Sequence, residues 1–221
     1  MVWTSTAWAL AALSAAAALA FGFFFLAKPP TPARAALKTA FMGALVVALV
    51  LVHAPTLLIV AALASAAGDA ALAFDKPFVL PIGILSFLIA QVCYLLLFRQ
   101  LSLGMAPDGA RFVLMAAVAW FAVVFLLWLW PRLGALAWGV VPYTAAIAAM
   151  AMSAMALPAA GWPAMLGAAS FFVSDATLSA ELFKLEPNAP ARKITAPVVW
   201  WTYVAAQALI IWGMLRLLQA H

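Results

Sequence analysis

Long apolar runs, each close to twenty residues, follow one another along almost the whole chain and are separated by short segments. A helical run of that length spans the hydrocarbon core of a bilayer, which is about 30 Å thick. The runs do not alternate polar and apolar residues as the strands of a membrane barrel do. Composition agrees, because 8% of the residues are charged against about 25% in a soluble domain. The sequence therefore predicts an all-α polytopic membrane protein.

The breaks between the runs predict eight transmembrane helices in one integral-membrane domain, residues 1–221. Most breaks contain proline, glycine or charge, as in "KPPTPAR", "DKP" and "KLEPNAPARK", and these residues end helices. The first run is expected to be a retained span, because it is too long for the apolar part of a signal peptide and no basic residue precedes it. The spans are expected at 5–27, 36–53, 55–74, 78–99, 111–130, 134–156, 162–182 and 196–218.

Lysine and arginine are distributed unevenly between the two sides that these spans define. Positive residues are enriched on the cytoplasmic side of membrane proteins, so the richer side is expected to be cytoplasmic, with both termini outside. The net charge of +5 is thereby explained by topology, and no nucleic-acid partner is expected. The richer side holds Lys28, Arg34, Lys38, Lys76, Arg132, Lys184, Arg192 and Lys193, and the other side holds Arg99, Arg111 and Arg216.

Two similar segments contain the acidic residues that matter most. "GDAALAF" at 68–74 and "SDATLSA" at 174–180 occupy the third span of the first and of the second four. Two four-helix halves, 1–105 and 106–221, would then be related by an axis along the membrane normal, unless the match between alanine-rich segments is chance. At 1.5 Å per residue, Asp69 lies roughly 8 Å and Asp175 roughly 12 Å below the same side. Two carboxyl groups at similar depth predict a site.

An ionisable side chain inside a membrane costs at least about 2.5–3.5 kcal/mol, which favours a functional role for Asp175. The alternatives are structural. Asp69 could reach water at a helix end, and Asp175 could join helices by bonding Ser174, Ser179 or a backbone carbonyl. Glu181 lies near the interface and is expected to be solvated.

A set of polar residues falls inside the spans and predicts a polar interior. Tyrosine normally favours the membrane interface, so tyrosines within spans are expected to point into the bundle, either towards a substrate or only to bond neighbouring helices. The set consists of Tyr94, Tyr143, Tyr203, Gln91 and Gln207.

Together, "GDAALAF", "AQVCYLLLF", "VVPYTAAIAAM", "FFVSDATLSAELF" and "WWTYVAAQALI" resemble the YhhN-type lysoplasmalogenase family of eight-span membrane proteins. The resemblance covers nearly the whole chain from about residue 25. Gln91 stands where many members are expected to have histidine, which puts an acid–base role at that position in doubt. By position, Gly68–Asp69 and Ser174–Asp175 match the two acidic motifs, Lys28–Pro29 matches the Lys-Pro after the first span, and Gln91, Tyr94, Tyr143, Tyr203 and Gln207 match the polar positions.

The resemblance implies cleavage of the vinyl ether bond of a lysoplasmalogen (lysoplasmenyl-ethanolamine or -choline) by water, giving a fatty aldehyde and a glycerophospho-alcohol. A vinyl ether hydrolyses when an acid protonates its β-carbon and water captures the oxocarbenium ion. Glycosidases meet a related cation with two carboxyl groups. Asp175 is expected to be the acid and Asp69 the anionic stabiliser and base, or the reverse. Water is the second substrate, and neither a metal nor an organic cofactor is expected.

The remaining expectations concern binding and location. Ser174 and the polar set are expected to contact the lysophospholipid. Cations at the cytoplasmic ends could hold its phosphate or serve topology alone, and Lys28 and Lys193 are the two expected at the site; the full set is Lys28, Arg34, Lys184, Arg192 and Lys193. The alternative function is a proton-coupled transporter of a small molecule or lipid that uses the same acids. The spans at 55–74 and 162–182 have no proline near the aspartates, which argues against broken transporter helices. A bacterial inner membrane is expected; headgroup preference and oligomeric state are left open.

Overall fold

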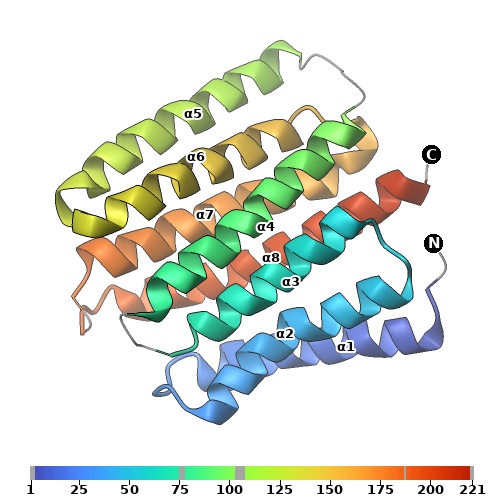
Figure 1. Ribbon diagram of the computed structural model, residues 1–221, viewed down its shortest axis with the longest axis horizontal. Coiled ribbons are helices and arrows are strands. Elements are labelled where there is room, and N and C mark those ends of the chain that lie inside the picture. The colour runs from blue at the N-terminus through green and yellow to red at the C-terminus, as the bar shows by residue number, and fades with distance from the viewer. Residues whose placement is uncertain (1–2, 75–77, 103–107, 187, 220–221) are drawn as a thin grey trace. The chain divides into compact units, whose positions relative to one another are not determined.

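The structure is a computed structural model that describes residues 3–74, 78–102, 108–186 and 188–219. The all-helical prediction is confirmed, since these residues form helices and no strands. Lys76 and His221 lie outside the described residues. The α-helices are α1 (Ser5–Ala20), α2 (Pro32–Leu51), α3 (Thr56–Ala71), α4 (Val79–Leu101), α5 (Gly109–Leu129), α6 (Ala137–Ala154), α7 (Trp162–Lys184) and α8 (Arg192–Gln219) (Figure 1).

Short helical turns join or extend several of these helices. A π-helical turn, η1 (Phe21–Phe25), continues α1, and the 3-10 turn η4 (Ala159–Gly161) precedes α7. The turns η2 (Trp130–Arg132) and η3 (Gly134–Leu136) connect α5 to α6. Local chemistry fixes the helix starts: Thr31 accepts a hydrogen bond from the amide of Arg34 before α2, and Asp108 accepts one from the amide of Arg111 before α5. Such caps satisfy amides that the first turn leaves without a partner.

Six of the described helices are long and apolar enough to cross a membrane. The helix α3 has 16 residues, about 24 Å at 1.5 Å per residue, which is shorter than the hydrocarbon core. The helix α7 has 23 residues, but its polar side chains, Asp175 and Glu181 among them, lower its hydropathy. Eight spans therefore stay a prediction. The six are Ser5–Phe25, Pro32–Leu51, Val79–Leu101, Gly109–Arg132, Gly134–Ala154 and Arg192–Gln219.

The chain forms two compact units, Met1–Tyr94 and Leu95–His221. In the first, α2 packs against both α1 and α3. The buried hydroxyl of Ser14 on α1 donates to the carbonyl of Phe41 on α2 at 2.7 Å. Gly68 on α3 lies against the ring of Phe87 on α4, so close that a Cβ at residue 68 would be 2.6 Å from the ring. Arg34 donates from Nε to the carbonyl of Phe25 at 3.1 Å, which satisfies the end of the π-helical turn.

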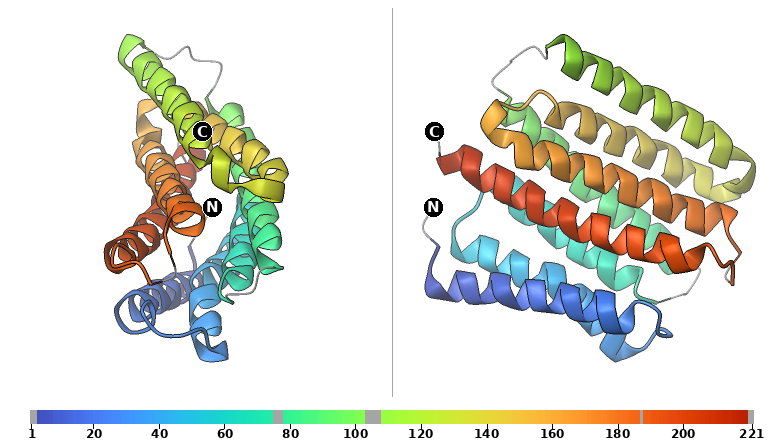
Figure 2. Two further views of the ribbon diagram at one scale, coloured as in Figure 1. Left: turned by 90° about the vertical axis from the view of Figure 1, so that its left-hand side faces the viewer. Right: turned by 180° about the vertical axis from the view of Figure 1, so that it is seen from behind.

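In the second unit, α7 and α8 run alongside each other over most of their length (Figure 2). Glycine permits this close approach: a Cβ on Gly167 would lie 2.8 Å from the backbone oxygen of Ala206, and one on Gly213 would lie 2.4 Å from the backbone nitrogen of Ala164. Small residues that bring backbones together are characteristic of helix pairs in membranes. The helix α6 packs against α7 on one side and α5 on the other.

We expect Gly213→Ala to destabilise the protein, because the new methyl group meets backbone atoms that cannot rotate away. Overpacking of this kind costs about 1–3 kcal/mol. The free energy of unfolding, measured by SDS titration of the detergent-solubilised protein, should fall by that amount.

The matched control is Gly43→Ala on α2, where a Cβ meets nothing within 4 Å. This variant should be neutral or more stable by about 0.5–1 kcal/mol, since alanine favours helix over glycine. Equal destabilisation of both variants would contradict the close packing of α7 against α8.

Candidate active site

Asp69 is buried in the first unit, with 1% of its surface exposed. It lies on α3, and its Oδ1 is 3.8 Å from Nζ of Lys38 on α2. The alternative in which Asp69 reaches water at a helix end is therefore wrong. A carboxylate beside an ammonium group is stabilised as an anion, and this suits a residue that has to stabilise positive charge.

The contact between Lys38 and Asp69 was not predicted from the sequence, where Lys38 served only as a topology signal. A signal for the contact was present. Lys38 is the third residue of the expected span 36–53, and Asp69 is five residues before the end of the expected span 55–74, on the same side of the membrane. The depth comparison that related the two aspartates would also have related Lys38 to Asp69.

One face of α4 carries two of the predicted polar residues, Gln91 and Tyr94, and both belong to the first unit. Phe87, Gln91 and Tyr94 follow the helical spacing that places side chains on one face. Phe87 contacts Gly68 on α3, and Tyr94 is hydrogen-bonded to Ser65, also on α3. This face is therefore turned towards α3, the helix that bears Asp69.

Gln91 is fully buried. Neither its amide nitrogen nor its amide oxygen has a hydrogen-bond partner among the described residues. Buried polar groups are nearly always paired, and leaving one unpaired costs about 1–3 kcal/mol. An amide in this condition has both a donor and an acceptor to offer to a polar ligand, which is consistent with the predicted binding role.

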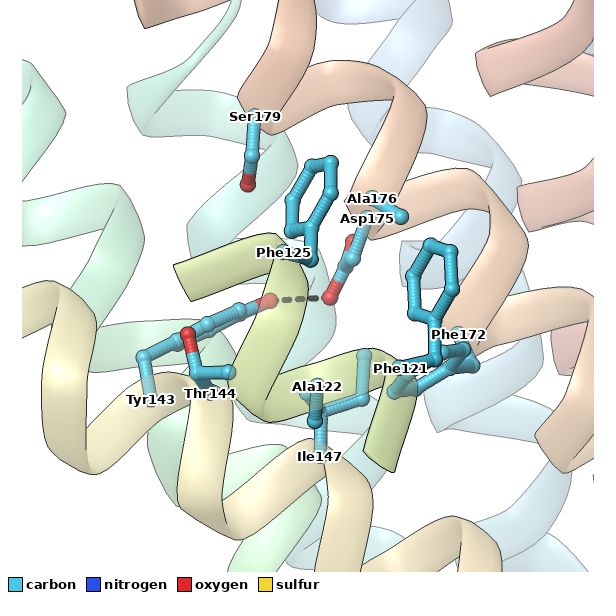
Figure 3. A pocket seen from close by; sticks show the side chains of 10 residues that line it. All are labelled: Phe121, Ala122, Phe125, Tyr143, Thr144, Ile147, Phe172, Asp175, Ala176 and Ser179. Atoms are coloured by element: carbon cyan, nitrogen blue, oxygen red, sulfur yellow. Dashed lines mark hydrogen bonds between the residues drawn. The ribbon is translucent and has the colours of Figure 1, made fainter. Parts of the chain in front are cut away.

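Asp175 lies in the second unit, on α7, with 8% of its surface exposed. The hydroxyl of Tyr143 on α6 donates a hydrogen bond to its Oδ2 (Figure 3). The prediction that Tyr143 points into the bundle agrees with this contact. The structural alternative, in which Asp175 bonds Ser174, Ser179 or a backbone carbonyl, is not the contact observed.

Asp175 opens into a small pocket between α5, α6 and α7 that is partly open to the surroundings. Three aromatic rings form much of its wall. The ring of Phe121 stacks on Phe125 at 5.5 Å and meets Phe172 edge-on at 5.6 Å. In Figure 3, Ser179 lies at one end of the pocket and Phe121 at the other, with Asp175 between them. The remaining lining residues are Ala122, Tyr143, Thr144, Ile147 and Ala176.

The other predicted residues of this unit lie along α7 and α8. The hydroxyl of Ser174 donates to the carbonyl of Val199 at 2.9 Å, and this hydrogen bond joins α7 to α8. The ring of Tyr203 packs edge-on against Phe171 at 5.7 Å. Gln207, one turn further along α8, is fully buried. None of these residues is part of the pocket wall.

The two lysines expected at the phosphate, Lys28 and Lys193, are exposed. Nζ of Lys28 lies 4.5 Å from the ring of Phe25, and Lys193 stands in the first turn of α8. Neither lines the pocket that contains Asp175. Both positions suit attraction of an anionic headgroup at a distance.

The prediction that Glu181 is solvated is wrong. Its side chain is buried, accepts a hydrogen bond from the hydroxyl of Thr195 and lies 3.9 Å from Nη1 of Arg192. Arg192 also donates to the carbonyls of Glu181 at 2.7 Å and Glu186 at 3.0 Å. The reason is that the last turn of α7 packs against the first turn of α8, where Arg192 satisfies carbonyls that the end of a helix leaves unpaired.

Removal of the Lys38 ammonium should destabilise the protein, because the buried carboxylate of Asp69 then loses a cation. Breaking a buried ion pair from one side costs about 3 kcal/mol. We expect Lys38→Met to lower the free energy of unfolding by about that amount in an SDS titration. Arg99→Met, which removes an exposed cation, should change it little.

The double variant Lys38→Met/Asp69→Asn measures how strongly the two residues depend on each other. Its free energy of unfolding should fall by clearly less than the sum of the two single losses, because neither residue is left as an unpaired charge. Additive effects would show that Lys38 and Asp69 do not stabilise each other.

Comparison with known proteins gives a family and two curated relatives. The profile of the YhhN family matches residues 33–214, which confirms the resemblance seen in the sequence. The chain is 34% identical over 163 residues to a protein of Mycobacterium bovis and equally to one of Mycobacterium tuberculosis, both named lysoplasmalogenase. The alignment covers 71% of this chain and 59% of each relative, so the chain spans less than two thirds of their length. No solved structure matches the chain.

Proposed function

The chain belongs to the YhhN family, and on this premise we propose that it is a membrane-embedded hydrolase that cleaves the vinyl ether bond of lysoplasmalogens with water. The products are a fatty aldehyde and a glycerophospho-alcohol. One observation carries the proposal: the buried carboxyl group of Asp175 accepts a hydrogen bond from Tyr143 at the wall of an aromatic pocket. The name of the two curated relatives supports the choice of substrate.

The proposed first step is proton transfer from the carboxyl group of Asp175 to the β-carbon of the vinyl ether. The C=C bond becomes a single bond, and an oxocarbenium ion forms at the carbon attached to oxygen. Asp175 becomes a carboxylate in this step, and the Tyr143 hydroxyl donates to it. That hydrogen bond strengthens as negative charge develops on Asp175. It therefore lowers the free energy of the transition state more than that of the ground state, and the reaction is faster.

In the proposed second step, the carboxylate of Asp69 stabilises the cation and accepts a proton from water as the water oxygen adds to the cationic carbon. The hydroxyl proton of the resulting hemiacetal passes to the glycerol oxygen, which leaves as an alcohol, and the aldehyde remains. Proton exchange with water then returns Asp69 to its carboxylate and Asp175 to its acid form. The surroundings support this division of roles. Asp69 faces the Lys38 ammonium and Asp175 faces a neutral phenol, so Asp69 is better suited to act as the anion and Asp175 as the proton donor.

The binding roles complete the proposal. The polar side chains orient the glycerophosphate and the ether oxygen, and the exposed lysines attract the anionic headgroup. No metal or organic cofactor takes part in the proposed reaction, and its partners are the lysophospholipid, water and the surrounding membrane lipids. The proposed binding residues are Gln91, Tyr94, Tyr143, Ser174, Tyr203, Gln207, Lys28 and Lys193.

We further propose that α3 and α7 also cross the membrane, which gives eight spans in two similar halves. A short or partly polar helix can span when neighbouring helices cover it. The location proposed is a bacterial inner membrane, with the basic helix ends and the active site towards the cytoplasm and both termini outside, as the distribution of lysine and arginine favours.

Asp175→Asn and Asp69→Asn should each lower the rate of aldehyde release from lysoplasmenyl-ethanolamine at least 100-fold, because general acid–base groups contribute about 10²–10⁴-fold. The measurement is aldehyde release by detergent-purified protein. Asp108→Asn is the matched control: Asp108 caps α5 at the surface, asparagine caps equally well, and activity should be retained. Wild-type protein that releases no aldehyde from either the ethanolamine or the choline substrate would overturn the proposed function.

Tyr143→Phe should lower kcat by roughly 100-fold, the usual cost of losing one donor to developing negative charge, and should raise KM by a smaller factor, because Tyr143 is also a proposed binding residue. The control is Thr202→Val, which removes a hydroxyl that bonds only its own helix at Val198 and Val199 among the described residues. A rise in KM with kcat unchanged would show instead that Tyr143 binds substrate without assisting proton transfer.

A further inference from the structure

Lys184, the last residue of α7, is held in a specific place at the end of the aromatic pocket wall. Its ammonium nitrogen lies 4.6 Å from the ring centre of Trp128 on α5. The Trp128 ring is in turn 5.5 Å from the ring of Phe125, which lines the pocket containing Asp175. One further ring therefore separates the ammonium group from the pocket.

The rings on α5 form a continuous strip. Phe121, Phe125 and Trp128 are separated by four and three residues, which places them on one face of the helix. Phe121 and Phe125 line the pocket, and Trp128 continues the strip by about one turn towards the end of α5. The strip therefore leads from the apolar part of the pocket, past the level of Asp175, to a cation.

The other cations at this end of the second unit are less suited to contact a ligand in the pocket. The guanidinium of Arg192 is engaged with the carboxylate and carbonyl of Glu181 and with the carbonyl of Glu186. Lys193 and Arg132 are exposed, whereas Lys184, which like them is not among the residues that line the pocket, is half-buried and lies over the ring of Trp128. An ammonium group above an indole ring still has N–H donors directed away from the ring, and lysine binds phosphate as a point charge.

We propose that Lys184 is the phosphate-recognition residue of this pocket, so that a single-chain glycerophospholipid binds with its chain against Phe121 and Phe172 and its phosphate beside Trp128. This inference rests on the proposed function, since it assigns the orientation of that substrate. Seven bonds join the phosphorus to the β-carbon of the vinyl ether, about 8 Å at roughly 1.2 Å per bond. That length exceeds the 5.5 Å between the ring centres of Trp128 and Phe125, so a phosphate beside Trp128 leaves the vinyl ether within reach of the pocket wall.

The position in the membrane agrees with this orientation. Tryptophan and lysine near the end of a span lie at the level of the lipid headgroups, which is where a phosphate lies. Phe172 is three residues before Asp175 on α7, deeper in the expected span, where the hydrocarbon chain lies. The vinyl ether, between chain and phosphate, would thus reach Asp175.

The test compares two substrates that share the vinyl ether and differ in the phosphate: lysoplasmenyl-ethanolamine and the 1-alkenylglycerol of the same chain length. Lys184→Gln should raise KM about 10-fold for the phospholipid, the effect of one charge-assisted contact. It should leave kcat and both constants for the alkenylglycerol unchanged. Lys184→Arg should restore most of the affinity. Arg132→Gln, which removes an exposed cation next to α5, should affect neither substrate.

Binding provides a second measurement that needs no turnover. The uncleavable 1-alkyl ether analogues with and without phosphoethanolamine are titrated into purified protein and followed by tryptophan fluorescence. Lys184→Gln should weaken binding of the phosphate-bearing analogue alone, by about 10-fold. Equal losses for both analogues, or no loss for either, would overturn the proposal. Wild-type protein that binds the phosphate-bearing analogue but releases no aldehyde would overturn the proposed function and leave this binding test decisive.

Discussion

A carboxyl group inside the hydrocarbon region of a membrane needs a partner, because water is absent and an unsatisfied charge is too costly. The described structure meets this need differently at each buried acid. Asp69 has a lysine on the neighbouring helix, Asp175 has a tyrosine hydroxyl, and Glu181 has both a threonine and an arginine. The choice of partner separates the three acids chemically: one carboxylate beside a cation, one carboxyl beside a neutral donor, and one acid used to join two helices.

The helices α3 and α7 fall short of a typical membrane span for different reasons. The helix α3 is apolar but has 16 residues, whereas α7 is long enough but carries Asp175 and Glu181. In α7 the loss of hydropathy is offset by packing, because glycines let it approach α8 closely and Ser174 donates to a carbonyl on that neighbour. Stability that cannot come from contact with lipid is thereby supplied by contact between helices.

Much of this arrangement could be predicted from the sequence, and the exceptions share a cause. Apolar runs and their breaks predicted the helices, and the rarity of acids identified Asp69 and Asp175, because both signals are local. The contact between Lys38 and Asp69, the burial of Glu181 against α8 and the aromatic pocket depend on which faces of two helices meet. Helical spacing places a residue on a face, but in a chain apolar all round, hydrophobicity does not show which neighbour that face contacts. Depth along the span is the remaining guide, and it relates Lys38 to Asp69 correctly.

The glycines at 167 and 213 have a consequence for how such a sequence can vary. The outer side of α5 can exchange one apolar residue for another freely, since Val113, Val123 and Leu127 are exposed and lipid tolerates any apolar shape. At Gly167 and Gly213 every other residue type adds an atom where a neighbouring backbone already lies. Evolutionary drift is therefore expected to be fastest on the outer face of α5 and slowest at the two glycines where α7 and α8 meet.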